Sequence, residues 1–312
     1  MDLSVVIPLL NERDNLRPLH DELARVLEGL GKSYEMLFID DGSTDGSADV
    51  LREIKGGDPH VRVIRLARNS GQTAALACGL KHAAGDVVIA MDGDGQNDPS
   101  DIPRLVEKLD EGYDLVSAWR PDRWRDQWLT RRVPSIAANA LISRMTSVKL
   151  HDYGCTFKAY RRELAQQLML YGEMHRFVPA IAAELGARIA EVEVNFRVRR
   201  SGLSKYGLGR AIRTLLDLLT VLFLSGYSTR PIQVFGAIGL VIGGIGGLWA
   251  ALLVFEKIVL GYELAKRPAL LLSVLLMVVG VQFVSLGLIG EMIARTYHES
   301  QGKPIYVIKE EF

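Results

Sequence analysis

The sequence predicts an α/β fold, in which helices cover a mostly parallel sheet, followed by two membrane-spanning helices. Three observations lead to this expectation. Short apolar runs alternate with helical patterns in the first part of the chain, which is the element order of a parallel sheet. Acidic and polar residues follow the ends of those runs. Two long stretches near the C-terminus contain no charged residue, and each is long enough to cross a bilayer as a helix.

The expected strands are short apolar runs of the kind found in buried parallel sheets. They are Leu3–Pro8, Tyr34–Ile39, Val61–Leu66, Asp86–Met91 and Asp114–Ala118. Helices are expected between them, because apolar residues recur there at helical spacing. The helical segments are a first one with Leu16, Leu19, Leu23, Val26, Leu27 and Leu30, then Ser47–Ile54, Thr73–Ala83 and one ending near Leu109. In sheets of this kind, ligands bind at the carboxyl ends of the strands.

The bulk composition limits the classes of function. The chain has 312 residues, enough for one large catalytic domain and a smaller appendage. Its 37 basic and 37 acidic residues balance, which argues against a nucleic-acid partner. Cys78 and Cys155 form no CxxC pair and favour a reducing compartment. The first residues contain neither a basic segment nor an apolar run, so no cleaved signal peptide is expected.

Polar clusters follow three of the expected strands. Asn11 and Glu12 follow the first strand, Asp40–Asp45 follows the second, and Asp92–Gln96 follows the fourth. Because the carboxyl ends of parallel strands meet at one edge of a sheet, these three clusters are expected to converge.

The Asp92–Gln96 cluster has the composition of a divalent metal site. Carboxylates two residues apart on a tight turn can share one cation, and glycines at 93 and 95 let the backbone bend sharply. Oxygen ligands such as those of Asp94 and Gln96 suit Mg²⁺ or Mn²⁺. Such a metal bridges a diphosphate and stabilises the charge on a departing nucleotide. The alternative is an ordinary turn, but the position directly after an apolar strand favours the metal site.

The Asp40–Asp45 cluster has two interpretations. Ser43, Thr44 or Asp45 can cap the helix that follows. Alternatively, Asp41 accepts a hydrogen bond from the imide or amide of a nucleotide base. The second interpretation is favoured, because the cluster lies on the same rim as Asp92–Gln96.

The C-terminal third reads as a membrane anchor. Residues 207–230 have the pattern of amphipathic juxtamembrane helices. Two transmembrane helices are expected within 231–294, and a tail follows at 295–312. The alternative is a pair of buried core helices, but two uncharged runs joined by a short loop favour a transmembrane hairpin. Glycines at 239, 243 and 247 form a small-residue face suited to close helix packing, as in a homo-oligomer.

Several of these motifs together carry a family resemblance. Val5–Glu12, Asp40–Asp45 and Asp92–Gln96 resemble the GT-A (Rossmann-like) catalytic domain of family 2 glycosyltransferases, which would occupy residues 1–206. The resemblance narrows to polyprenyl-phosphate glycosyltransferases, a group that includes dolichol-phosphate mannose synthases and bacterial undecaprenyl-phosphate glucosyl and aminoarabinosyl transferases. The narrowing motifs are Asp152–Cys155, Met174–Phe177, Arg199–Tyr206 and the hairpin with Arg295 and Pro304–Ile308 behind it.

The resemblance implies a role for each matching position. The nucleotide sugar would contact Pro8, Leu10, Asn11, Glu12, Asp41 and Asp92, and the metal would be held by Asp92, Asp94 and Gln96. The lipid phosphate would be bound by Arg120, Arg132, Ser135, Arg199 and Lys205. The catalytic residues would be Asp152, Asp94, Arg120 and Arg132.

One position departs from the resemblance. Some relatives carry a second acidic residue shortly after the position of Asp152, where this chain has Cys155 and Thr156. A phosphomonoester has a second pKa of about 6, so a lipid phosphate is already anionic and needs positioning more than a base. Asp152 is therefore interpreted as a residue that orients the sugar or the metal ligands, with the catalytic-base role left open.

The expected function is metal-dependent, inverting transfer of a sugar from a UDP- or GDP-linked donor to undecaprenyl or dolichyl phosphate, for cell-envelope or glycan modification. The enzyme would be a multi-pass protein of the inner (cytoplasmic) membrane with its catalytic domain and tail in the cytoplasm, where nucleotide sugars are made. A processive polysaccharide synthase is one alternative, but the chain lacks the QxxRW motif. A non-catalytic membrane scaffold with a nucleotide-binding fold is another, and the intact Asp92-Gly93-Asp94 argues against it.

Overall fold

The computed structural model describes residues 1–121, 148–172, 174–195 and 305–312, together with Ser143, Arg197 and separate helical residues between 246 and 292. The chain divides into two compact units. The first consists of Met1–Ser225 and Pro304–Phe312, and the second of Gly226–Lys303.

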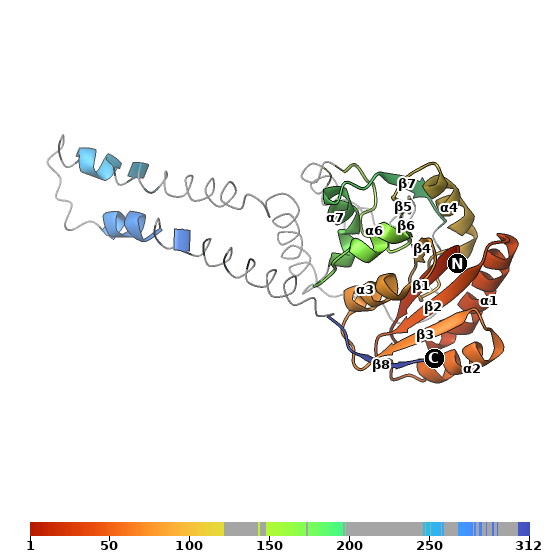
Figure 1. Cartoon of the computed structure of the whole chain (residues 1–312). Helices are drawn as coiled ribbons and strands as arrows, with labels where there is room; N and C mark the ends of the chain where they lie inside the picture. The colour runs from red at the N-terminus through yellow and green to blue at the C-terminus, as the bar shows by residue number, and fades with distance from the viewer. Residues whose placement is uncertain are drawn as a thin grey trace. The chain divides into compact units, whose positions relative to one another are not determined.

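The first unit is built on an eight-stranded sheet with the strand order β7-β5-β6-β4-β1-β2-β3-β8 (Figure 1). Strands β3, β2, β1 and β4 run parallel to one another, and β5 runs parallel to β7, which confirms the prediction of a mostly parallel sheet. Strand β6 is antiparallel to β4 and β5, and β8 is antiparallel to β3. The strands are β1 (Leu3–Leu9), β2 (Tyr34–Asp40), β3 (Val61–Leu66), β4 (Val87–Ala90), β5 (Leu115–Trp119), β6 (Lys158–Arg161), β7 (Ile189–Glu193) and β8 (Ile308–Glu311).

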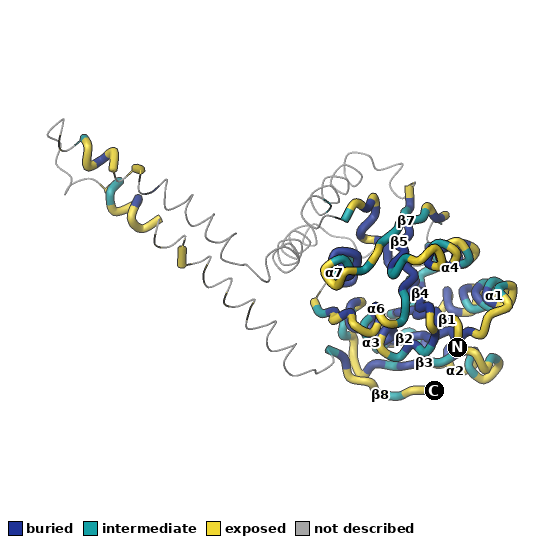
Figure 2. The backbone as a smooth tube through the Cα atoms, turned by 45° about the horizontal axis from the view of Figure 1, so that its top comes forward, coloured by how far each residue is buried: buried dark blue, intermediate teal, exposed yellow. Residues whose placement is uncertain are grey.

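Helices cover both faces of this sheet, so the central strands are buried along their length (Figure 2). On one face pack α1 (Arg13–Gly29), α2 (Ser47–Gly57) and α4 (Ile102–Asp110), and on the other α3 (Gln72–His82), α6 (Arg162–Gln167) and α7 (Val178–Glu184). Short 3-10 helices lie at Pro99–Asp101 and Met174–Arg176. Strand side chains alternate between the two cores. Val5 and Ile7 pack with α1, and Val6 packs with α3.

Helix α3 approaches β1 so closely that only glycine fits at position 79. A Cβ there would lie 2.1 Å from Val6 Cγ1. We expect Gly79→Ala to lower the melting temperature of the full chain by roughly 5 °C, because overpacking a dense core is costly. Gly56→Ala is the matched control, since a Cβ at position 56 would meet no atom within 4 Å. Equal melting temperatures for the two variants would contradict this packing.

The C-terminal residues form part of the sheet of the first unit. Strand β8 pairs with β3, opposing Glu310 to Arg65 and Glu311 to Ile64. The backbone amides of Val63 and Phe312 donate to each other's carbonyls at 2.8 and 3.0 Å. The last part of the 295–312 tail is therefore an edge strand, a placement that its short and charged sequence did not predict.

The second unit is described only in part. Its described residues are helical and carry exposed apolar side chains, with Leu248 68%, Ile258 78% and Leu271 76% exposed. Among the residues described, no helix is both long and apolar enough to span a bilayer. Most of the predicted hairpin at 231–294 and all of the amphipathic segment at 207–230 lie outside the described residues.

Candidate active site

The three polar clusters meet at the carboxyl edge of β1, β2 and β4, as predicted. Leu9 pairs with Asp40 in the sheet register, and Asp41 N donates to Leu9 O at 3.0 Å. On the other side of β1, Met91 N donates to Val6 O at 3.1 Å. A Cβ at position 93 would lie 3.1 Å from Leu9 Cβ, so the glycine lets the turn after β4 reach the end of β1.

Asn11 and Glu12 form a tight turn that is joined to the loop after β2. Asn11 has φ +56°, the one positive φ of a non-glycine residue in the described part of the chain. Its backbone N donates to Ser43 Oγ at 2.9 Å, and its side-chain oxygen accepts from Thr44 N at 2.9 Å. Glu12 N donates to Ser47 Oγ at 3.2 Å. These bonds hold the two predicted nucleotide-binding segments together as one surface, next to buried Pro8 and half-buried Leu10.

Asp41 is buried and holds the loop that precedes α3. One carboxylate oxygen accepts from Ser70 N at 2.7 Å and the other from Gly71 N at 2.9 Å. Burial raises the pKa of Asp41 and outweighs these two amide contacts, which favour the carboxylate. A Cβ at position 42 would lie 2.8 Å from the carbonyl carbon of Arg68. The 40–45 and 68–71 loops are therefore packed against each other at the strand edge.

Asp92 and Asp94 lie on the turn after β4, both half-buried. Asp92 Oδ1 accepts from Gln72 Nε2 at 2.8 Å, which joins this turn to the loop that Asp41 holds. Asp94 Oδ1 accepts from Gln96 N at 3.1 Å, with φ +73° at Gly95 between them.

The oxygen ligands on this turn suit a metal ion that also binds a substrate. The described residues contain no group of three His, Cys, Asp or Glu side chains placed to hold a metal ion by themselves. Mg²⁺ commonly binds through one or two carboxylates together with substrate phosphates. Two carboxylates and the amide oxygen of Gln96 fit that pattern, so Asp92, Asp94 and Gln96 fit Mg²⁺ or Mn²⁺ in the presence of a diphosphate.

Arg120 and Asp152 form a buried ion pair. Arg120 Nε lies 2.8 Å from Asp152 Oδ2, and the two side chains are 5% and 12% exposed. Burial disfavours the Arg120 cation, but the acidic groups around it, Asp152 and Asp92 among them, raise its pKa above the usual value. Because β6 runs antiparallel between β4 and β5, Arg120 after β5 and Asp92 after β4 lie at the same edge of the sheet.

Strand β7 holds the backbone around Asp152. Glu191 accepts from the backbone amides of His151 and Asp152 at 2.9 and 3.1 Å. The His151 ring stacks on Trp119, with 4.3 Å between the ring centroids. Asp152 is therefore positioned both through its side chain and through its backbone.

Lys158 is a buried cation at the start of β6 that the sequence did not single out. It opposes Ala90 of β4 and is 1% exposed, with its Nζ 3.5 Å from Tyr153 O. Burial lowers its pKa, while nearby Cys155, Asp152 and Asp92 favour its charged form. A lysine within the otherwise apolar or uncharged run Cys155–Tyr160 is the signal that could have found it, because a charged residue in a buried strand needs a partner.

Arg197 contacts the turn after β4. Its backbone N donates to Gln96 O at 3.0 Å, and its guanidinium pairs with Asp98 at 2.7 Å and with Glu22 at 2.5 Å. Four predicted site residues lie outside the described residues, namely Arg132, Ser135, Arg199 and Lys205.

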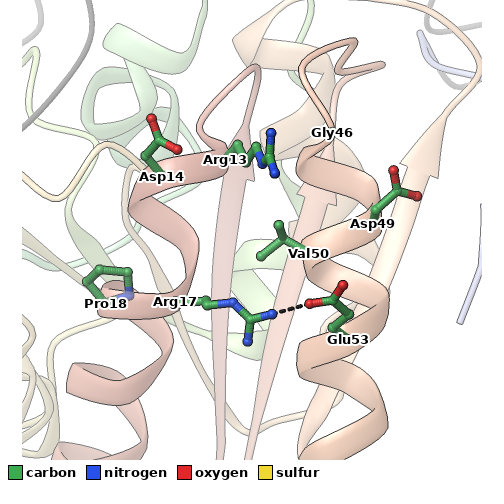
Figure 3. A pocket seen from close by; sticks show the side chains of 8 residues that line it. All are labelled: Arg13, Asp14, Arg17, Pro18, Gly46, Asp49, Val50 and Glu53. Carbon is green, nitrogen blue, oxygen red and sulfur yellow. Dashed lines mark hydrogen bonds and ion pairs between the residues drawn. The ribbon is translucent and has the colours of Figure 1, made fainter.

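A separate groove of about 570 Å³ lies between the first turns of α1 and α2 (Figure 3). Its basic side chains, Arg13 and Arg17, are balanced by Asp14, Asp49 and Glu53, and Arg17 pairs with Glu53. None of the predicted site residues lines it. The candidate active site is therefore the carboxyl edge of the sheet and not this groove.

Comparisons with known proteins show which proteins this chain is similar to. The model of glycosyl transferase family 2 matches residues 4–169. The chain is 41% identical, over its whole length and 93% of the relative's, to a dodecaprenyl-phosphate galacturonate synthase of Rhizobium johnstonii. It is 39% identical, over 98% of its own length and 93% of the relative's, to an undecaprenyl-phosphate 4-deoxy-4-formamido-L-arabinose transferase of Edwardsiella ictaluri.

A solved structure shares the fold. It is glucosyl-3-phosphoglycerate synthase of Mycobacterium tuberculosis, crystallised with Mn²⁺ and UDP-glucose. The TM-score is 0.57 at 23% identity, covering 72% of this chain and 79% of that one.

Proposed function

This chain belongs to glycosyltransferase family 2, and from that membership we propose that it transfers a sugar from a nucleotide-sugar donor to a polyprenyl phosphate. The observation that carries the proposal is that Asp92 and Asp94, which follow β4, and the Arg120–Asp152 ion pair, whose arginine follows β5, lie at one edge of the sheet, because β6 runs antiparallel between the two strands. The names of both curated relatives, which align along nearly the whole chain, support the same acceptor.

The donor site is the surface formed by Pro8, Leu10, Asn11, Glu12 and Asp41 together with Asp92. The two carboxylate oxygens of Asp41 accept hydrogen bonds from the backbone amides of Ser70 and Gly71. Each oxygen can accept one more hydrogen bond, and a nucleotide base would donate it. Asp92, Asp94 and Gln96 hold Mg²⁺ or Mn²⁺, which supplies charge stabilisation for the departing nucleoside diphosphate. The backbone of Arg197 contacts this turn, so Arg199, two residues on, is proposed to reach the phosphates.

The transfer needs positioning and charge neutralisation. An oxygen of the lipid phosphate forms a bond to the anomeric carbon, and the bond from that carbon to the nucleoside diphosphate breaks, with inversion. Because the attacking phosphate is already anionic, no strong base is required. Asp152 orients the sugar, and Arg120 holds Asp152 in place. Arg132, Ser135, Arg199 and Lys205 are proposed to bind the acceptor phosphate.

The second unit is proposed to anchor the enzyme in the membrane as a transmembrane hairpin within 231–294. The exposed apolar side chains of its described helices support contact with lipid. The hairpin holds the catalytic unit at the depth of the headgroups, on the cytoplasmic side of the inner membrane, and offers faces for a homo-oligomer.

The test is a panel of radiolabelled UDP-glucose, UDP-galacturonic acid and GDP-mannose, incubated with membranes containing the enzyme and polyprenyl phosphate. Lipid-extractable counts that require both the enzyme and the polyprenyl phosphate are expected with one of the donors. Release of the sugar into water, or incorporation into a long polymer, would contradict the proposed acceptor.

Arg132 is expected to bind the phosphate of the polyprenyl-phosphate acceptor. Arg132→Ala should raise the KM for polyprenyl phosphate about 10-fold or more, since a charge-assisted contact to phosphate is lost. The KM for the nucleotide sugar should stay near the wild-type value. A poorer donor KM with an unchanged acceptor KM would reassign Arg132 to the nucleotide.

The proposed topology places Tyr262 on the far side of the membrane from the catalytic unit. In a background without Cys78 and Cys155, a cysteine at position 262 should react with an impermeant thiol reagent applied to intact cells. A cysteine replacing the exposed Glu28 of α1 should react only after permeabilisation. The reverse labelling pattern would overturn the proposed topology and, with it, the use of cytoplasmic nucleotide sugars.

A further inference from the structure

Three charged residues form a row across the neighbouring strands β2, β3 and β8. The register places Asp40 of β2 opposite Arg65 of β3, and Arg65 opposite Glu310 of β8. Arg65 Nε lies 3.2 Å from Asp40 Oδ2, and Arg65 Nη1 lies 3.2 Å from Glu310 Oε1. Arg52 of α2 also pairs with Glu310, at 2.9 Å. Cross-strand pairs of opposite charge at this spacing stabilise each other.

Asp40 depends on this row for its charge partner, because its side chain is fully buried. A buried carboxylate is tolerated only when it is paired and hydrogen-bonded. Its Oδ1 accepts from Ser43 N at 2.8 Å, and Arg65 provides the opposite charge at Oδ2. Arg65 Nη2 also donates to Ser43 O at 3.2 Å. Arg65 therefore holds both the carboxylate at the start of the 40–45 loop and the backbone of that loop.

The loop that Arg65 holds is the one that shapes the donor surface. Ser43 Oγ accepts from Asn11 N, and Thr44 N donates to the side chain of Asn11. Asn11 has a left-handed backbone conformation, which costs energy for a residue with a side chain and persists when neighbours hold it. A shift of Ser43 is therefore transmitted to Asn11 and Glu12.

We infer that Glu310 is a positioning residue for the donor nucleotide, which acts through Arg65 on the Asp40–Ser43 loop. The inference rests on the proposed function, because it takes that loop and Asn11 as the nucleotide surface. The C-terminal strand, which follows the proposed membrane hairpin in the chain, then completes the support of the donor site. The nucleotide does not touch β8 in this arrangement.

The adjacent acid on the same strand provides a matched control. Glu311 pairs with Arg62 at 2.8 Å, and Arg62 also pairs with Glu35 at 2.8 Å. Glu35 accepts from Ser4 Oγ and from Ala84 N, near the amino ends of β1 and β4. Glu311→Gln therefore removes one carboxylate from β8, as Glu310→Gln does. The contacts of the 40–45 loop stay unchanged.

The experiment measures binding of UDP and GDP with Mn²⁺, and the steady-state constants, for the full chain in nanodiscs. We expect Glu310→Gln to weaken nucleotide binding and raise the donor KM about fivefold, which is the scale of losing partly exposed ion pairs. The kcat and the acceptor KM should stay close to wild type. Glu311→Gln should match wild type in all four constants and show a similar melting temperature to Glu310→Gln.

A double-mutant cycle tests whether Glu310 acts through Arg65. In an Arg65→Lys background, Glu310→Gln should add less than its effect on the wild-type protein, because the guanidinium fork that links Glu310 to Ser43 is already lost. Full additivity, or equal nucleotide affinity for Glu310→Gln and Glu311→Gln, would overturn the inference while leaving the proposed function intact. A wild-type protein that binds neither nucleotide would overturn the proposed function itself.

Discussion

Replacing Asp94 by alanine is expected to abolish sugar transfer and to leave the protein folded. The half-buried side chain accepts one turn hydrogen bond, from Gln96 N at 3.1 Å. Losing that bond costs about 1 kcal/mol of stability. In catalysis the expected loss is much larger, because the carboxylate is proposed to help hold the metal that would offset the charge of the departing diphosphate. We expect turnover to fall by about 10³-fold or more, the scale of removing a key electrostatic stabiliser.

The measurement combines initial rates over a range of Mg²⁺ and Mn²⁺ concentrations with a melting curve. Asp49→Ala is the matched control, because it removes an exposed carboxylate of α2 whose side chain is 76% exposed. Its turnover should equal that of the wild type. Near-normal turnover of Asp94→Ala, or full wild-type activity in EDTA, would refute the metal site.

Replacing Asp152 by asparagine is expected to lower kcat by about 10²-fold or more, in line with the loss of a group that orients the reacting sugar. It should also destabilise the protein by about 3–5 kcal/mol, since the buried guanidinium of Arg120 loses its carboxylate partner. The backbone at position 152 should stay in place, because Glu191 binds its amide independently of the side chain.

A second variant separates the two effects. In the double variant with Arg120→Gln and Asp152→Asn, two neutral amides replace the buried ion pair, so most of the lost stability should return. The kcat should not return, because the sugar still lacks the Asp152 carboxylate. Recovery of kcat together with the melting temperature would show that Asp152 acts only in folding.

The pH dependence of kcat distinguishes an orienting residue from a base. If Asp152 orients the sugar, the pH–rate profile of the asparagine variant should keep the shape of the wild-type profile at a lower level. Loss of the acidic limb in the variant would identify Asp152 as the group that titrates, and the catalytic-base role would then hold.

Much of the site could be predicted from local patterns. The runs at Leu3–Leu9 and Tyr34–Asp40 are short and apolar, and their spacing allows a crossover helix between them, so their parallel pairing followed from general topology. Once the strands are parallel, their polar ends must share an edge. That is why the meeting of Asn11, Asp41 and Asp92 at one edge was predictable from the sequence.

The contacts that hold those residues could not be predicted in the same way. Asp41 binds Ser70 and Gly71, about 30 positions away in the chain, and Asp152 contacts Arg120, which follows β5, and Glu191 of β7. The sequence records the charges but not their partners, since any of many arginines could pair with a given carboxylate. Only packing selects the pair with the right distance and burial.

The sequence by itself therefore determined the class of fold, the three polar clusters and the edge where they meet, because strand period and crossover connections are local properties. The tertiary structure decided the antiparallel strands β6 and β8, and with them the burial of Lys158 and the pairing of Glu310 with Arg65. Glu310 reaches Arg52 across 258 positions. No local pattern encodes such a contact, because an edge strand is selected by the hydrogen-bonding groups that the rest of the sheet leaves open.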